Sequence, residues 1–117
     1  MSNRRLAVKR TEYFADILKA LASVVRLRIV RLLIEYGDHG CCASDIQKEI
    51  GGASSTLSHH LDTLARFGLV SSRKEAQWIF YSVNYSVLKE LFNFLWQDCC
   101  RRSPDLVQLE EEVGRVP

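Results

Sequence analysis

The fold is decided by one stretch of the chain, ASSTLSHHLDTLARFGLV (residues 53–70) followed by SSRKEAQWIFYSV (residues 71–83). In its first half, Leu57, Leu61, Leu64 and Ala65 recur at helical spacing, which predicts a helix with one apolar face. Gly68 follows, where glycine readily takes the left-handed conformation that ends a helix. The second half is typical of two strands joined by a short turn with basic residues beside it. We therefore predict a helix followed by a β-hairpin.

The outward face of that helix carries short hydrogen-bonding side chains, whereas an ordinary solvated helix more often carries Glu and Lys there. Short polar groups allow close approach to base edges in the DNA major groove. The helix is therefore expected to read bases, and the hairpin to contact the DNA backbone or minor groove. The predicted DNA-binding residues are Ser54, Ser55, Thr56, Ser58 and His59 on the helix, and Arg73, Lys74 and Gln77 on the hairpin.

The remaining sequence predicts a mainly α fold around this stretch. Periodicity and capping signals place further helices at residues 11–22, 24–36, 44–50 and 85–102, with a short strand or helix entry at Cys41 and Cys42. The expected N-caps include Ser23 for the second helix, Ser44 for the third, and Ser54 or Ala53 for the fourth. The third and fourth helices would form a helix-turn-helix, and the hairpin would form its wing.

The last predicted helix is apolar on more than one face. One face is expected to cover the core of the monomer, and the excess indicates a homodimer interface. The residues predicted for that interface are Leu88, Leu91, Phe92, Leu95 and Trp96.

Five segments together resemble a known family, the ArsR/SmtB winged-helix repressors. They are LKALASVVRLRIVRLL (18–33), SDI (44–46), STLSHHLDTL (55–64), GLV (68–70) and WIFYSV (78–83). The resemblance covers about residues 11–100 and implies a dimer that binds operator DNA and releases it when a metal, metalloid or oxidant reaches cysteines or histidines. The chain departs from the family at Val24-Val25, where proline is usual, and at Ala76 in the wing turn, where glycine is usual. Positive φ is unfavourable for alanine, so a different turn type is an alternative.

Composition fits one DNA-binding domain with two polar ends. The 117 residues carry a net charge of +2, but residues 1–102 hold 15 basic and 10 acidic side chains. We expect a flexible basic arm at residues 1–10, a winged helix-turn-helix domain at 11–102, and a flexible acidic tail at 103–117. The sequence shows no signal peptide and no long apolar run, so a cytoplasmic protein that does not contact membranes is expected.

The four cysteines form two adjacent pairs, Cys41-Cys42 and Cys99-Cys100. In a cytosolic protein such cysteines favour metal or redox chemistry over structural disulfides. Cys99 and Cys100 are the predicted sensing site, with Cys41 and Cys42 as additional ligands or bystanders. In a regular helix the side chains of Cys99 and Cys100 would diverge by roughly 100°. Both sulfurs can therefore bind one ion only where the helix loosens. The neighbouring Arg101 and Arg102 favour thiolates.

Thiolates bind soft ions, which excludes hard oxygen-preferring cations as inducers. The family branch with a vicinal cysteine pair at the end of the last helix implies trivalent arsenic or antimony. Arsenite would take a third thiolate, whereas a monomethyl arsenical would be satisfied by two. Soft metals such as cadmium, lead or zinc, and oxidation or persulfide chemistry, remain alternatives. DNA binding itself is expected to need no cofactor.

An enzyme is not expected. A catalytic cysteine is usually activated by a histidine, and His39 is the only histidine close in sequence to a cysteine, Cys41. A winged helix that serves as a protein-interaction module is the remaining alternative.

Overall fold

The computed structural model describes residues 2–103, with side chains from residue 5 onward, as five α-helices, one short 3-10 helix and a three-stranded sheet. Residues 104–117, which hold nearly all of the expected acidic tail, lie outside the described residues. In chain order the elements are α1 (Ser2–Leu21), α2 (Val24–Tyr36), η1 (Gly37–His39), β1 (Cys41–Cys42), α3 (Ala43–Ile50), α4 (Ser54–Arg66), β2 (Val70–Glu75), β3 (Trp78–Val83) and α5 (Tyr85–Trp96). The predicted order of elements is confirmed.

The first helix starts earlier than predicted. Residues 2–10, expected as a flexible arm, form the first half of α1, which runs without interruption to Leu21. Leu6, Ala7, Lys9 and Arg10 are good helix formers, and they extend the helix that is already fixed further along the chain. Every third residue from Phe14 to Ala20 is buried, so only the second half of α1 packs onto the core.

Local capping signals explain the next boundaries. The Ser23 hydroxyl accepts a hydrogen bond from the backbone N–H of Arg26 at 3.3 Å, which confirms Ser23 as the N-cap of α2. Ser44 does not cap α3, because the helix already begins at Ala43 and Cys42 stands at the cap position. Ala53 is the N-cap of α4, and Gly68 follows that helix with φ +76°, as its sequence position predicted.

The sheet is small, antiparallel and ordered β1-β3-β2. β2 and β3 form the wing, with Val70 opposite Val83 at one end and Glu75 opposite Trp78 beside the turn. β1 adds only two residues, which pair with Tyr81 and Phe80 on the other edge of β3. The short strand therefore ties the start of α3 to the wing.

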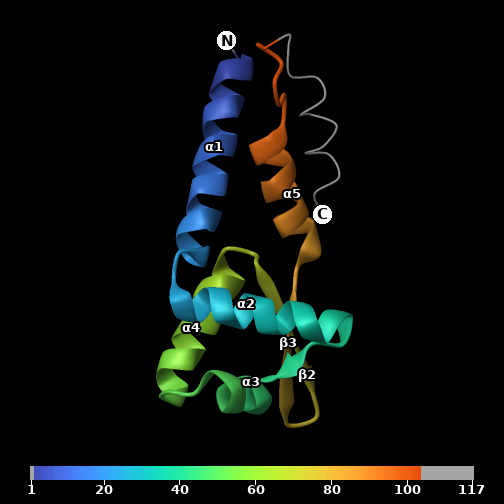
Figure 1. Ribbon diagram of the computed structural model, residues 1–117. Coiled ribbons are helices and arrows are strands. Elements are labelled where there is room, and N and C mark those ends of the chain that lie inside the picture. Colours follow the sequence, from blue (N-terminus) through green and yellow to red (C-terminus); the bar gives the residue numbers. More distant parts are fainter. Residues whose placement is uncertain (1, 104–117) are drawn as a thin grey trace.

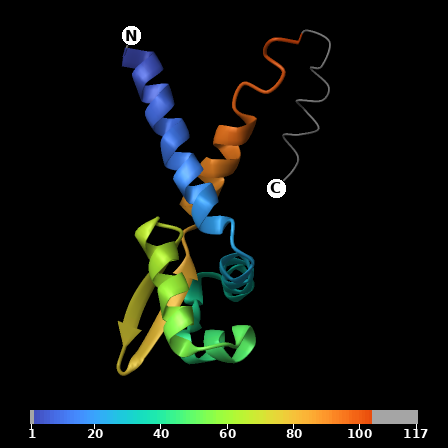
Figure 2. The same cartoon turned by 90° about the vertical axis from the view of Figure 1, so that its left-hand side faces the viewer.

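The apolar core joins all of these elements at the base of the molecule. Its members come from every α-helix and every strand, and those with the least exposure are Ile17, Ile29, Leu33, Cys41, Ile46, Leu64 and Leu69. In Figure 2 the wing lies on the left of the base, α4 crosses in front of it, and α2 and α3 lie to its right. No helix among residues 2–103 is long and apolar enough to cross a membrane.

α1 and α5 stand together above this base, as Figure 1 shows. They make contact through stacked rings of Phe14 and Phe94, whose centroids are 4.5 Å apart, and through a 3.2 Å hydrogen bond from Arg10 to Gln97. The result is an elongated molecule with principal extents of 55 × 33 × 24 Å. Because this pair of helices projects from the core, much of its apolar surface has no partner among residues 5–103.

Candidate DNA interface and thiol sites

The polar face of α4 is exposed, as the helical periodicity predicted. Leu57, Leu61 and Leu64 are buried against the core. The five predicted base-reading residues are all exposed on the other side: Ser54, Ser55, Thr56, Ser58 and His59. The structure thus presents a row of short polar side chains on a helix of 13 residues whose opposite face is anchored.

Two residues on the buried side of α4 differ from the helical pattern. Ala65, predicted on the apolar face, is exposed, whereas Thr63 is buried. The Thr63 hydroxyl donates a 3.0 Å hydrogen bond to the carbonyl oxygen of His59, one turn earlier, so its burial leaves no unpaired donor. The buried face is therefore rotated towards Thr63 and away from Ala65, which the leucine spacing alone does not reveal.

The wing presents its basic residues at the tip of the hairpin. Arg73, Lys74 and Gln77 are all exposed, as a contact with the DNA backbone requires. Arg73 is already engaged: its Nε lies 3.0 Å from a Glu75 carboxylate oxygen, and its guanidinium sits 4.9 Å from the ring centre of Phe80 on the facing strand. Lys74 makes no ion pair with any side chain between residues 5 and 103. Lys74 is therefore the freer cation for a phosphate.

The wing turn keeps a left-handed residue without glycine. Glu75 pairs with Trp78, so Ala76 and Gln77 alone form the loop, and Ala76 adopts φ +54°. Tight two-residue hairpin loops demand positive φ at their first position, because this matches the twist of the strands. The turn therefore retains positive φ, and Ala76 adopts this conformation although it is unfavourable for alanine.

The first cysteine pair splits between the core and the surface. The Cys41 side chain is buried, and its Sγ lies 3.6 Å from the carbonyl oxygen of Cys42. Burial raises the pKa of the Cys41 thiol, although a hydrogen bond with Tyr36 acts in the opposite direction. Cys42 points elsewhere, with its Sγ 3.1 Å from the Ser44 hydroxyl. The two neighbouring thiols thus occupy different environments, as alternation along a strand requires.

The second pair lies outside the helix that was predicted to hold it. α5 ends at Trp96, six residues before the predicted end at Arg102. Asp98 and Cys100 adopt φ of +60° and +62°, which no right-handed helix accommodates. Short-range bonds replace the helical ones, including Cys99 N–H to the Trp96 carbonyl at 3.0 Å and Arg101 N–H to the Asp98 carbonyl at 3.1 Å. The loosened backbone that two converging thiols need is therefore present.

In this turn the two sulfurs converge. The Sγ atoms of Cys99 and Cys100 are 3.4 Å apart, and both side chains are half-buried. Arg101 forms an ion pair with Asp98 at 3.5 Å on the rim of the same turn. Adjacent sulfurs at this separation are able to bind one soft atom together or to join as a disulfide.

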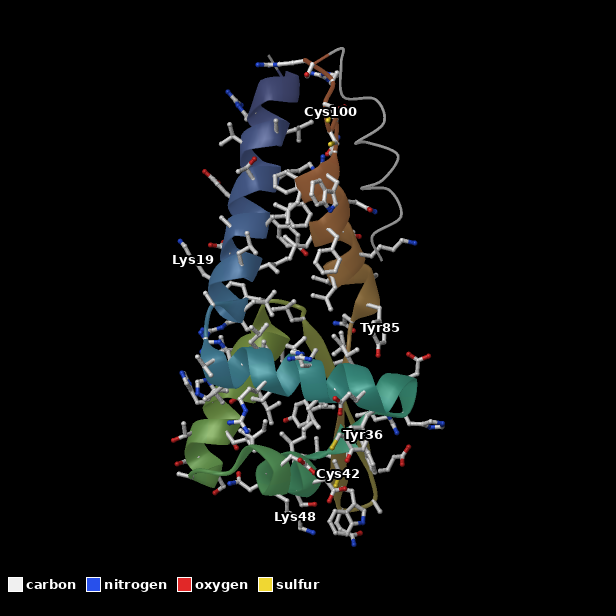
Figure 3. All side chains as sticks on the ribbon, viewed as in Figure 1. Lys19, Tyr36, Cys42, Lys48, Tyr85 and Cys100 are labelled. Atoms are coloured by element: carbon white, nitrogen blue, oxygen red, sulfur yellow. The ribbon has the colours of Figure 1, made fainter. Side chains whose placement is uncertain are left out.

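The two cysteine pairs do not meet within one chain. Figure 3 places Cys100 at the far end of the α1–α5 pair and Cys42 near the base, below α2. Among the described residues there is no group of three or more His, Cys, Asp or Glu side chains that fits a metal ion. His60, on α4, faces Arg26 at 3.1 Å and lies far from any cysteine in the sequence.

The outer face of α5 is apolar and exposed. Phe92, Leu95 and Trp96 remain 49%, 56% and 51% exposed. Leu91, which was predicted at the dimer interface, is instead buried at 2% exposure in the monomer core, and Leu88 packs at the edge of that core. Leu91 belongs to the side of α5 that packs into the core, whereas its neighbour Phe92 points outward.

The geometry is that of a winged helix-turn-helix with an exposed polar recognition helix and a basic wing tip. Residues 23–72 match the family model described as bacterial regulatory protein, arsR family. An HTH-type transcriptional regulator of Methanocaldococcus jannaschii is 35% identical over 75% of this chain and 97% of its own length. The chain belongs to the arsR family.

Solved structures and other relatives agree with this membership. HlyU from Vibrio cholerae is 33% identical, with a TM-score of 0.64 over 79% of this chain and 97% of that one. A CadC homologue of Staphylococcus aureus, named as a cadmium resistance transcriptional regulatory protein, is 30% identical over 77% of this chain and 73% of its own. This arsR-family chain is thus a DNA-binding regulator of transcription, in agreement with the expectation that it is not an enzyme.

Proposed function

We propose that this arsR-family protein is a homodimeric repressor that leaves its operator when a thiophilic species, foremost trivalent arsenic, binds Cys99 and Cys100. The observation that supports the proposal most directly is the 3.4 Å separation of the two Sγ atoms. If a soft atom bound both sulfurs at about 2.3 Å, as zinc does, this separation would correspond to a bond angle of about 95° at that atom. A pyramidal trivalent atom suits such a narrow angle, so ligation demands little movement of the sulfurs.

The number of thiolates favours a ligand with two free bonds. Arsenite takes three sulfurs, and antimonite behaves alike. Cys41 is buried and Cys42 lies at the opposite end of the molecule from Cys100, so neither supplies a third sulfur within the same chain. A monomethyl arsenical already has one bond to carbon and needs only the adjacent pair. We therefore place methylated trivalent arsenic ahead of arsenite as the inducer.

The position of the turn suggests how release occurs. Gln97, directly before the turn, accepts the hydrogen bond from Arg10 of α1. The exposed apolar residues Phe92, Leu95 and Trp96 occupy the last two turns of α5. Ligation at Cys99 and Cys100 would reshape the end of this surface, through which we propose that two subunits associate. In the dimer the spacing of the two α4 helices must match one turn of DNA, about 34 Å.

Release also requires the inducer to bind the DNA-free form more tightly than the DNA-bound form. The turn that carries Cys99 and Cys100 lies at the opposite end of the α1–α5 pair from the base that holds α4 (Figure 3). The inducer therefore acts on the spacing of the subunits and does not compete for DNA directly.

The test measures fluorescence anisotropy with a labelled fragment of the protein's own promoter. Monomethylarsenite should release wild-type protein and the Cys42→Ser control. Cys99→Ser and Cys100→Ser should bind the same DNA with unchanged affinity and stay bound when the arsenical is added. Release of both variants at the wild-type concentration of arsenical would remove the site from consideration.

Two thiols this close also favour a redox response as a second candidate. A disulfide requires the sulfurs to close to about 2.05 Å, and a peroxide would accept the two electrons while the two thiols lose their protons. A solved relative is described as reduced HlyU, 31% identical over 80% of this chain. Intact mass distinguishes the outcomes, because a disulfide lowers the mass by two hydrogen atoms whereas a bound arsenical raises it.

A further inference from the structure

One guanidinium group connects three helices at the base of the α1–α5 pair. Arg26 lies in the first turn of α2, and its Nε donates a 2.6 Å hydrogen bond to the carbonyl oxygen of Ala20 in α1. Its Nη1 lies 3.1 Å from Nδ1 of His60 in α4. The Ser23 cap holds the backbone of Arg26 and so fixes the origin of its side chain. Arg26 thereby joins the end of α1 to the recognition helix.

The chemistry of the two side chains sets the state of the histidine. Arginine offers only donors, so Nδ1 of His60 must accept, and the ring hydrogen must lie on Nε2. A protonated His60 carries N–H on both nitrogens. Its Nδ1–H would then face the N–H of Arg26, and two positive charges would lie side by side. The contact therefore exists only with neutral His60.

Among the described residues, no acidic side chain counters this repulsion at His60. Burial lowers the pKa of His60, and the charges of Arg26 on α2 and His59 on α4 lower it further. The residues that line the small cavity beside His60 come from α2, α3, the α3–α4 turn and α4 itself, and all are uncharged: Val25, Ile50, Gly51, Gly52, Ala53, Thr56 and Leu57. From α1, the group that reaches this cluster is the Ala20 carbonyl, a helix C-terminal acceptor that stabilises the Arg26 cation.

We propose that Arg26 is a positioning residue for DNA recognition, which holds α4 against the end of α1 through neutral His60, and that protonation of His60 breaks this link and weakens operator binding. α1 is part of the projecting helix pair, whereas α4 carries the base-reading side chains His59 and Ser58. A loose link lets α4 rotate relative to the dimer, so the two recognition helices lose their fixed spacing. The loss of one hydrogen bond to a charged group corresponds to an affinity change of about tenfold.

The decisive experiment compares operator affinity between about pH 5 and pH 8 for wild type and His60→Gln, at constant ionic strength. Glutamine keeps an acceptor oxygen for Arg26 but does not take up a proton. Wild type should weaken on acidification by about tenfold more than His60→Gln does. The same comparison in a His59→Gln background removes the neighbouring imidazole from both proteins, so the difference between those two curves isolates His60. Parallel curves for the two proteins would overturn the proposal.

Arg26→Met supplies a second, independent measurement. Methionine preserves an apolar stem without donors, so the variant should bind operator more weakly at neutral pH and lose the His60-dependent step. Nitrogen NMR of the His60 ring should show the Nε2–H tautomer in wild type, and a higher His60 pKa in Arg26→Met. An unchanged ring pKa together with wild-type affinity would show that Arg26 only caps α1. A misfolded Arg26→Met leaves the comparison with His60→Gln decisive.

Discussion

The rings of Phe14 and Phe94 stack with centroids 4.5 Å apart and an interplanar angle of 24°. This stack fixes which side of α5 faces α1. Arg10 covers the same pair, with its guanidinium carbon 5.9 Å from the Phe14 ring centre and 5.5 Å from that of Phe94. Because Phe94 turns inward, Phe92, Leu95 and Trp96 must turn outward. The monomer fold thus creates the apolar surface that we assign to the dimer.

Leu95→Asp should produce a folded monomer. The side chain is 56% exposed, so the charge is tolerated in the single chain but would be buried without a partner in a dimer. Light scattering at micromolar concentration should give a dimer mass for wild type and a monomer mass for the variant. Leu91→Asp, one turn earlier and buried, should instead unfold the chain, as circular dichroism would show. A Leu95→Asp variant that remains dimeric would refute this interface.

Lys74→Ala should weaken binding to all DNA sequences alike. A lost phosphate contact lowers the slope of log affinity against log salt by about one unit. Arg73→Ala should have a smaller effect, because Glu75 and Phe80 already hold its guanidinium. Titrations of specific and random DNA at several salt concentrations provide both quantities. An unchanged slope in Lys74→Ala would place the wing tip away from the DNA backbone.

Ser58→Ala and His59→Ala should change sequence preference instead. Both residues are exposed on α4, and each good base contact contributes about 1–3 kcal/mol of discrimination. Competition between operator and singly substituted operators measures this discrimination. If both variants ranked the substituted operators as wild type does, α4 would not read bases through these side chains.

Gly40→Ala should destabilise the protein more than Gly37→Ala. Both glycines have left-handed φ, +78° and +71°. Alanine at either position would therefore lower the free energy of unfolding by about 1 kcal/mol through backbone strain. At Gly40 an added Cβ would also lie 2.5 Å from the Tyr81 carbonyl oxygen, whereas at Gly37 it would meet nothing within 4 Å. Overpacking adds about 1–3 kcal/mol. Urea denaturation of the two variants measures the difference, and equal losses would contradict the close approach of β1 to β3.

Cys41 should be the slowest cysteine to react with iodoacetamide in the folded protein. Its thiol is buried, and burial raises its pKa, so the reactive thiolate forms only at higher pH than in the unfolded chain. The stability that follows from this shift is complete below the unfolded pKa and is lost as pH rises through the folded pKa. Peptide mapping by mass spectrometry between about pH 7 and pH 10 gives the order, with urea-unfolded protein as the control. Early alkylation of Cys41 would mean that β1 opens readily.

The sequence alone determined the elements whose signals are local. The leucines of α4 lie on one helical face whatever surrounds them, so the exposed serines and His59 followed directly from 3.6-residue periodicity. Ser23 as a cap and Gly68 as a helix end also depend only on near neighbours. For the same reason the order of helices and strands, and with it the winged helix-turn-helix fold, was predictable.

Tertiary structure decided the features that depend on which surfaces meet. Periodicity shows that Leu91 and Phe92 point in different directions, but only the stacking of Phe94 on Phe14 decides which one is buried. Arg26 and His60 are 34 residues apart in sequence, so no local pattern pairs them. The approach of the Cys99 and Cys100 sulfurs depends on a backbone that leaves the helix after Trp96. The sequence determines which side chains are present. Which of them lie within contact distance is determined by the folded backbone and by packing between segments.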